Sequence, residues 1–329
     1  MPPSTSVADA PAPDLEFDEP LDIPRVVSLG DRLFQGISAG AATTALLIVS
    51  ATAFFLIWRS VDAFRSAGVI DFLTESVWNP SEGRFGVGGL LIGTVLIAAV
   101  ALMVAVPMGL GLSLFVNEYA PARLKGVLVS AIDLLAALPS LIFGLWGFFA
   151  LQGPLQGVAQ WFADHLSVIP FFQTEQGDDL TRSAFVGGIV VGIMILPIVT
   201  SVSREVMSQC PRDQCEAALG LGGTRWGMIR TVILPFSRSG MVGAVLLGFG
   251  RALGETIAVT IIVSLETQPN TRVLTSGGGS VAQLIATKFG EASPLEVSAL
   301  VGAGAALFLL TLVVNLAARR IVSRARSAQ

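Results

Sequence analysis

The sequence EAALGLGGTRWGMIRTVILP, residues 216–235, is a polar segment between two strongly apolar runs. Strong helix formers from Glu216 onward predict a short helix, and the three glycines between Gly220 and Gly223 predict that it ends there in a sharp reversal. Thr224 is a suitable N-cap for a second short helix, and Pro235 predicts the end of the segment before the next apolar run. We therefore expect a helix-turn-helix hairpin that lies outside a lipid bilayer.

The composition is that of an integral membrane protein. Of 329 residues, 53% are hydrophobic and 13% are charged, and the mean hydropathy is +0.73. Water-soluble domains carry about 25% charged residues. Membrane lipid is thus the expected surrounding of the chain, and nothing in the composition indicates nucleic acid as a partner.

Six stretches have the length of about 20 mostly apolar residues that a membrane-spanning helix needs. Lipid leaves the backbone no other way to satisfy its hydrogen bonds, so an all-α six-helix bundle is expected. The predicted spans are approximately 36–58, 88–116, 127–151, 184–203, 240–264 and 298–318.

Basic residues predict the orientation. If the N-terminus is cytoplasmic, the segments on that side hold thirteen Lys and Arg residues and the outward segments hold six. Because cytoplasmic loops carry the excess of Lys and Arg, both termini are expected inside. The hairpin, within a loop over 208–238, is then cytoplasmic. The long outward loops either meet a soluble partner or only cap the bundle.

The chain divides into three predicted parts. Residues 1–27, rich in acidic residues and proline, are expected to form a disordered cytoplasmic tail. Residues 28–322 form the membrane domain, and residues 323–329 form a short basic cytoplasmic tail. Asp133, near the start of the third apolar run, is expected to lie near the cytoplasmic interface and to bond a neighbouring helix end, with a role in the pathway as the alternative.

The fifth apolar run contains two charges, Arg251 and Glu255, the latter followed by Thr256. Counting about 1.5 Å per residue from Gly240 places both near the middle of a hydrocarbon core about 30 Å thick. Charges there are costly, so both side chains should face the protein interior or a wet cavity. Four residues apart on one helix, they either form a structural ion pair or line a substrate pathway. An arginine fork suits a tetrahedral oxyanion.

The hairpin sequence resembles the EAA loop of ABC-importer permeases. The matching positions are Glu216, Ala217, Ala218, Gly222, Leu234 and Pro235, with Val232 where the pattern prefers isoleucine. The resemblance implies the type I, MetI-like permease architecture. It also implies that the hairpin is a coupling element that fits a groove on a separate ATP-hydrolysing subunit.

Two further stretches, RALGETIAV at 251–259 and LLAALPSLIFGLWG at 134–147, resemble phosphate-importer permeases, the PstC type more than the PstA type. That resemblance implies that Arg251 and Glu255 matter for transport of inorganic phosphate across a bacterial inner membrane. The implied partners are a PstA-like second permease subunit in a heterodimer, a PstB-like ATPase dimer and a PstS-like external phosphate-binding protein. A permease for sulfate or molybdate and a secondary anion transporter remain alternatives.

Several chemistries are not expected. The only lysines, Lys125 and Lys288, do not follow the glycine pattern of a phosphate-binding loop, so the chain should have no ATPase site of its own. The spacing of Cys210, Cys215 and the single His165 resembles neither a zinc site nor a redox motif. No metal, cofactor or catalytic residue is therefore predicted.

Overall fold

The computed structural model describes residues 28–175 and 177–327, and it separates into two units, Met1–Ala51 and Thr52–Gln329. The predicted acidic tail 1–27 lies outside the described residues. Helix α1 (Leu29–Arg59) begins with reciprocal hydrogen bonds, in which Asp31 N donates to Ser28 Oγ at 3.1 Å and Ser28 N donates to Asp31 Oδ2 at 3.0 Å. None of its residues is buried. Residues 29–35, ahead of the predicted first span, are the start of this continuous helix.

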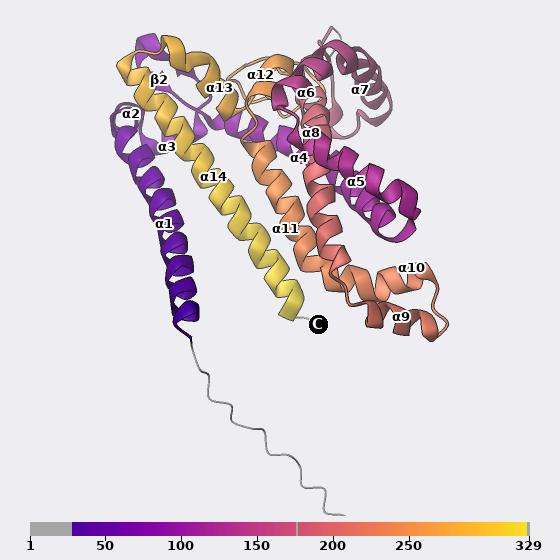
Figure 1. Ribbon diagram of the computed structural model, residues 1–329. Helices are drawn as coiled ribbons and strands as arrows, with labels where there is room; N and C mark the ends of the chain where they lie inside the picture. Colours follow the sequence, from indigo (N-terminus) through magenta and orange to yellow (C-terminus); the bar gives the residue numbers. More distant parts are fainter. Residues whose placement is uncertain (1–27, 176, 328–329) are drawn as a thin grey trace, which may run out of the picture. The chain divides into compact units, whose positions relative to one another are not determined.

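Four long apolar helices form the frame of the second unit: α4 (Gly88–Leu114), α8 (Ala184–Ser208), α11 (Leu234–Leu253) and α14 (Pro294–Ser327). Helix α8 lies between α4 and α11 (Figure 1). Glycines permit this packing. A Cβ added to Gly188 of α8 would stand 2.5 Å from Val100 Cβ of α4, and a Cβ added to Gly248 of α11 would stand 2.9 Å from Val199 Cγ2 of α8. Small residues at such positions let helices approach closely.

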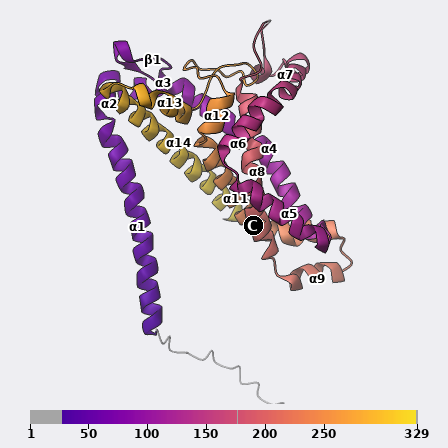
Figure 2. The same ribbon diagram turned by 45° about the horizontal axis from the view of Figure 1, so that its top comes forward.

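Shorter elements occupy the two ends of this frame. At one end lie α9 and α10, and at the other lie α7, α12, α13 and a two-stranded sheet in which Trp78 of β1 pairs with Phe85 of β2 (Figures 1 and 2). The short helices are α2 (Val61–Ala67), α3 (Val69–Thr74), α5 (Ala122–Ala137), α6 (Ser140–Trp146), α7 (Gln152–Leu166), α9 (Arg212–Gly220), α10 (Arg225–Met228), α12 (Ile257–Ile262) and α13 (Val281–Lys288). The strands and the 3-10 and π turns are β1 (Trp78–Asn79), η1 (Pro80–Glu82), β2 (Arg84–Phe85), η2 (Phe115–Tyr119), η3 (Gly147–Leu151), η4 (Pro170–Phe172), η5 (Ile229–Ile233) and η6 (Phe289–Glu291).

Three hydrophobic clusters hold the second unit together. The largest joins α4, α6, α8 and α12 and includes Val190 and Ile262. A second joins α2, α3, α13 and α14 around Phe72. The third is small and separate, and it lies at the hairpin end of the frame around Met207 and Ile229. The hairpin therefore has a core of its own.

The prediction of six membrane-spanning helices is confirmed. Within the described residues, six helical runs are long and apolar enough to cross a bilayer: Leu29–Arg59, Gly88–Tyr119, Ser140–Leu166, Ala184–Ser208, Arg225–Leu253 and Pro294–Ala318.

Two of the six runs differ most from the predicted spans. The expected helix over 127–151 is broken at Leu138, which is extended with ψ 136° because Pro139 follows it, and the long run extends instead to Leu166. The expected helix over 240–264 is also wrong at both ends. The helical run in the structure begins at Arg225 and stops at Leu253.

Candidate transport and coupling sites

Helix α9 ends in a Schellman motif that the glycines make possible. Gly222 has φ +84°, a conformation that side-chain-bearing residues rarely adopt. Its N–H donates to Leu219 O at 3.0 Å, and Gly223 N donates to Ala218 O at 3.2 Å, which satisfies two carbonyls at the helix end. A Cβ on Gly223 would stand 2.5 Å from that same Ala218 oxygen. The predicted sharp reversal is confirmed.

The second helix of the hairpin begins at the predicted N-cap, since Thr224 Oγ1 accepts a hydrogen bond from Gly227 N at 3.1 Å. The prediction that Pro235 ends the hairpin is wrong. Helix α10 continues through the π turn η5 into α11 as one run that reaches Leu253. The wide turn directly before Pro235 accommodates a residue that has no N–H to donate. The hairpin is thus continuous with the fifth span.

The hairpin has one face in its own core and one face exposed. Cys215 and Ala218 pack against the third cluster, whereas Glu216 is exposed. At the tip, Leu221 is 91% exposed and Trp226 is 58% exposed. These exposed side chains leave the outer face of the hairpin without partners among the described residues that could bury them.

One hydrogen bond joins the hairpin to helix α4. The guanidinium of Arg225 donates through Nη1 to the carbonyl oxygen of Glu118 at 3.3 Å, in the π turn η2 that ends α4. The hairpin thereby contacts the ends of both α4 and α8.

Arg251 and Glu255 do not share a helix face. Helix α11 ends at Leu253, and the chain is irregular through Gly254 to Thr256 before α12 begins. Glu255 is 7% exposed, and its Oε1 accepts a hydrogen bond from Ala258 N at 3.2 Å, so it caps α12. The Arg251 side chain is exposed and makes no hydrogen bond or ion pair within residues 28–175 and 177–327. Of the two alternatives, the structural ion pair is not found in this described part of the chain.

The two stretches that resemble phosphate-importer permeases lie side by side. Helices α6 and α12 pack together (Figure 2), with Gly144 of α6 and Gly147, the first residue of η3, facing α12. A Cβ on Gly144 would stand 3.0 Å from Ala258 Cα, and one on Gly147 would stand 2.9 Å from Ile262 Cδ1. The two helices therefore run in the same direction, and the chain break before α6 is level with the break before α12.

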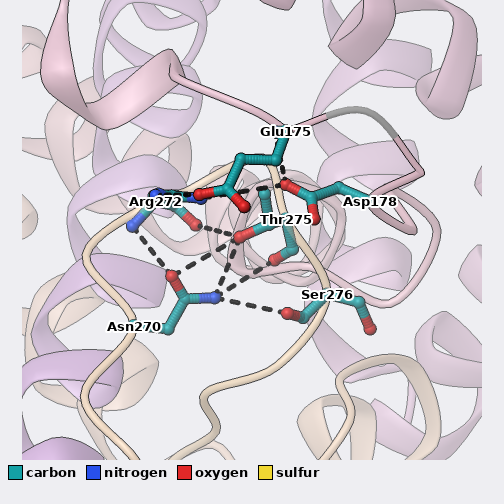
Figure 3. Close-up of polar contacts among 6 residues, drawn as sticks. All are labelled: Glu175, Asp178, Asn270, Arg272, Thr275 and Ser276. Carbon is teal, nitrogen blue, oxygen red and sulfur yellow. Dashed lines mark hydrogen bonds and ion pairs between the residues drawn. The ribbon is translucent and has the colours of Figure 1, made fainter.

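A polar network joins two loops at the end of the molecule opposite the hairpin (Figure 3). Arg272 Nη2 lies 2.7 Å from Glu175 Oε1, and Arg272 Nη1 lies 3.9 Å from Asp178 Oδ2. Asn270 Nδ2 donates to Thr275 Oγ1 at 3.1 Å, which holds the Arg272 turn in shape. The loop between α12 and α13 is thus tied to the loop before α8.

Asp133 bonds a neighbouring helix, since its Oδ1 accepts a hydrogen bond from Ser201 Oγ at 3.1 Å, but Ser201 lies within α8 and not at the predicted helix end. The two cysteines, Cys210 and Cys215, are free thiols. No group of three or more His, Cys, Asp or Glu side chains suited to a metal ion is found in the described parts of the chain.

Residues 105–327 match the family described as "Binding-protein-dependent transport system inner membrane component". The chain belongs to this family. Among curated relatives, the permease is 42% identical over 317 residues to "Phosphate transport system permease protein PstC 2" of Mycobacterium tuberculosis, with 92% of this chain and 97% of the relative covered. It is 34% identical to "Phosphate transport system permease protein PstC" of Xylella fastidiosa, with 89% of this chain and 91% of the relative covered. These relatives place the permease in the PstC branch.

A solved structure has the same fold. The permease superposes with a TM-score of 0.54 on a chain of a bacterial ABC transporter involved in the import of the acidic polysaccharide alginate, at 17% identity. The superposition covers 89% of this chain and 99% of the other. At this identity the likeness concerns the fold alone, and it agrees with the predicted MetI-like architecture.

Some features of these sites escaped the sequence interpretation. The exposure of Leu221 and Trp226 was not predicted, although an apolar residue between glycines at the tip of a polar hairpin is a signal that could have been used. The contacts of Arg225 and Arg272 join residues about 100 positions apart, at separations of 107 and 97. No local pattern in the permease indicates such pairs.

Proposed function

We propose that this permease imports inorganic phosphate as one of two non-identical membrane subunits of an ATP-driven importer in a bacterial inner membrane. Its relatives carry the name of phosphate transport permeases over nearly their whole length. A PstA-like subunit completes the membrane pair, and a PstS-like protein delivers phosphate at the outer face. Both termini and the hairpin lie in the cytoplasm, as the distribution of basic residues favours.

The hairpin is the contact with the ATPase. Glu216, Leu221 and Trp226 of the hairpin are all exposed, and tryptophan is among the residues that contribute most to protein interfaces when it becomes buried. A PstB-like ATPase dimer would cover this surface. Because the hairpin is continuous with α11, movement of the ATPase would be passed directly to the fifth span.

Arg251 is the group proposed to meet phosphate, and its exposure carries this assignment. Leu247 and Ile257, near it in sequence, are exposed apolar side chains, so an unpaired guanidinium lies on a surface that would otherwise suit lipid. A charge facing lipid costs roughly 2.5–3.5 kcal/mol on insertion scales. Arg251 therefore faces the second subunit across a wet pathway, where its planar fork binds an oxyanion through paired hydrogen bonds.

Glu255 and Thr256 lie in the irregular segment between α11 and α12, which follows Arg251. Glu255 caps α12, and the Thr256 hydroxyl donates to Gly254 O at 3.2 Å. Both keep the chain irregular next to Arg251. Their proposed role is to position the pathway, while Arg251 makes the anion contact.

The test is ATP-driven uptake of labelled phosphate by the complex reconstituted with its companion subunits. Arg251→Gln should reduce uptake by 10-fold or more, on the order of the loss of one charge-assisted contact, while the complex still assembles. Arg251→Lys keeps the charge without the fork and should recover only part of the rate. Loss of assembly, or uptake of sulfate in preference to phosphate, would overturn the assignment.

A further inference from the structure

We propose that Cys210 and Cys215 are a site of reversible disulfide formation that locks the hairpin against the end of helix α8. The two Sγ atoms are 3.8 Å apart, already in van der Waals contact. Cys210 follows the end of α8, and Cys215 lies in α9. A disulfide bond of about 2.05 Å needs the sulfurs to approach by less than 2 Å, on the order of a side-chain rotation.

The surroundings favour a disulfide over a metal–thiolate site. Both side chains pack in the small hydrophobic cluster of the hairpin with Met207 and Met228. Burial, the neighbouring Cys215 and the negative charge of Glu118 raise the pKa of Cys210 to about 11. A pair of bound thiolates would add negative charge to an apolar site near a carboxylate, whereas a disulfide is neutral.

Exposure sets the order of the reaction. Cys215 is half-buried and Cys210 is buried, so Cys215 is the thiol that an oxidant reaches first. The Cys215 thiolate attacks a low-molecular-mass disulfide such as oxidised glutathione, breaks its S–S bond and forms a mixed disulfide with release of one thiol. Cys210 then loses its proton and attacks the Cys215 sulfur, and the second thiol leaves. The protein loses two electrons and two protons, and the oxidant becomes two thiols.

The disulfide would uncouple ATP hydrolysis from phosphate transport. Residues 211–214 would become a closed loop that fixes the first turn of α9 to the end of α8, so α9 could no longer pivot at Pro211. This part of the inference rests on the proposed role of the hairpin as the ATPase contact. The thiol chemistry does not depend on that role, so the two can fail separately.

Bond formation is tested on the full-length chain in detergent or nanodiscs. The protein is incubated with mixtures of reduced and oxidised glutathione, alkylated and digested, and the peptides are weighed. We expect the peptide that contains both cysteines to lose two hydrogens and to resist alkylation, and Cys215→Ser to abolish this. Glutathione adducts alone, disulfide-linked dimers of the chain, or two alkylatable thiols under oxidising conditions would overturn the proposal.

The consequence is tested on the reconstituted complex. Oxidation should lower ATP-driven phosphate uptake by about 5- to 150-fold, the usual range for coupling between two sites, and dithiothreitol should restore it. Cys215→Ser should transport like the reduced wild type and be insensitive to the same oxidant. Formation of the intramolecular bond with unchanged uptake would overturn the lock. Failure of the reduced complex to transport phosphate would instead overturn the proposed function, while the peptide masses still decide whether the bond forms.

Discussion

Replacing Gly222 by alanine should destabilise the end of helix α9, because the backbone there has φ +84°. An L-residue in a left-handed conformation costs about 1–2 kcal/mol. The hydrogen bonds from Gly222 N to Leu219 O and from Gly223 N to Ala218 O both depend on this conformation. The equilibrium between the formed and the opened helix end should therefore shift by a factor of about 5–30.

Gly220→Ala is the matched control. Gly220 is the last residue of α9, and a Cβ added to it meets no atom within 4 Å. Alanine in a helix is favoured over glycine by roughly 0.5–1 kcal/mol, so this variant should be as stable as the wild type or more so. The two substitutions add the same methyl group two residues apart and should act in opposite directions.

Hydrogen exchange measured by mass spectrometry on the full chain in nanodiscs follows this opening directly. Exchange in peptides that cover 212–223 should be about 5- to 30-fold faster in Gly222→Ala and unchanged or slower in Gly220→Ala. ATP-driven uptake by the assembled complex should fall only in Gly222→Ala. If both variants changed exchange in the same direction, the Schellman motif would not be what holds the hairpin.

Three further substitutions test other contacts. Glu216→Lys reverses the charge on the exposed hairpin surface and should uncouple ATP hydrolysis from uptake; normal uptake would contradict the docking role. Glu255→Ala removes the cap of α12 and should cost about 0.5–2 kcal/mol, seen as a lower Tm, whereas Glu255→Gln keeps an acceptor and should lose less; equal losses would contradict capping. Arg272→Ala removes two exposed ion pairs worth at most about 1 kcal/mol each. Hydrogen exchange of the Val273 and Ser276 amides, which donate hydrogen bonds across the two loops, should therefore become faster. Unchanged exchange would show that the ion pairs contribute nothing to holding the loops together.

The sequence predicted the number of spans and the hairpin well, because both depend on local signals. Length and hydropathy decide whether a helix can cross a bilayer. Gly222 and Thr224 specify a helix end and a helix start through their own backbone and side-chain chemistry, and the structure has both as expected. Hydrogen bonds of this kind are formed within a few residues, so a single sequence contains them.

The breaks inside the apolar runs were harder to predict. Hydropathy continues across Leu138 and across Gly254, so it predicts one helix in each run. The signal at Leu138 was present, since a residue before proline avoids the helical region. Gly254 has no such neighbour, and the short helix that follows it, α12, packs against Gly144 of α6 and Gly147 of η3. That contact joins distant parts of the chain and cannot be seen in either stretch alone.

The unbroken run from Arg225 to Leu253 is about 43 Å long at 1.5 Å per residue, so with the hairpin in its proposed coupling role it would act as a lever. When a stiff rod tilts about a point near its middle, its two ends swing in opposite senses. Inward displacement of the hairpin would thus carry Arg251 outward, away from Glu255, which stays with α12 and its neighbour α6. The gap between these two side chains would widen and narrow once per stroke.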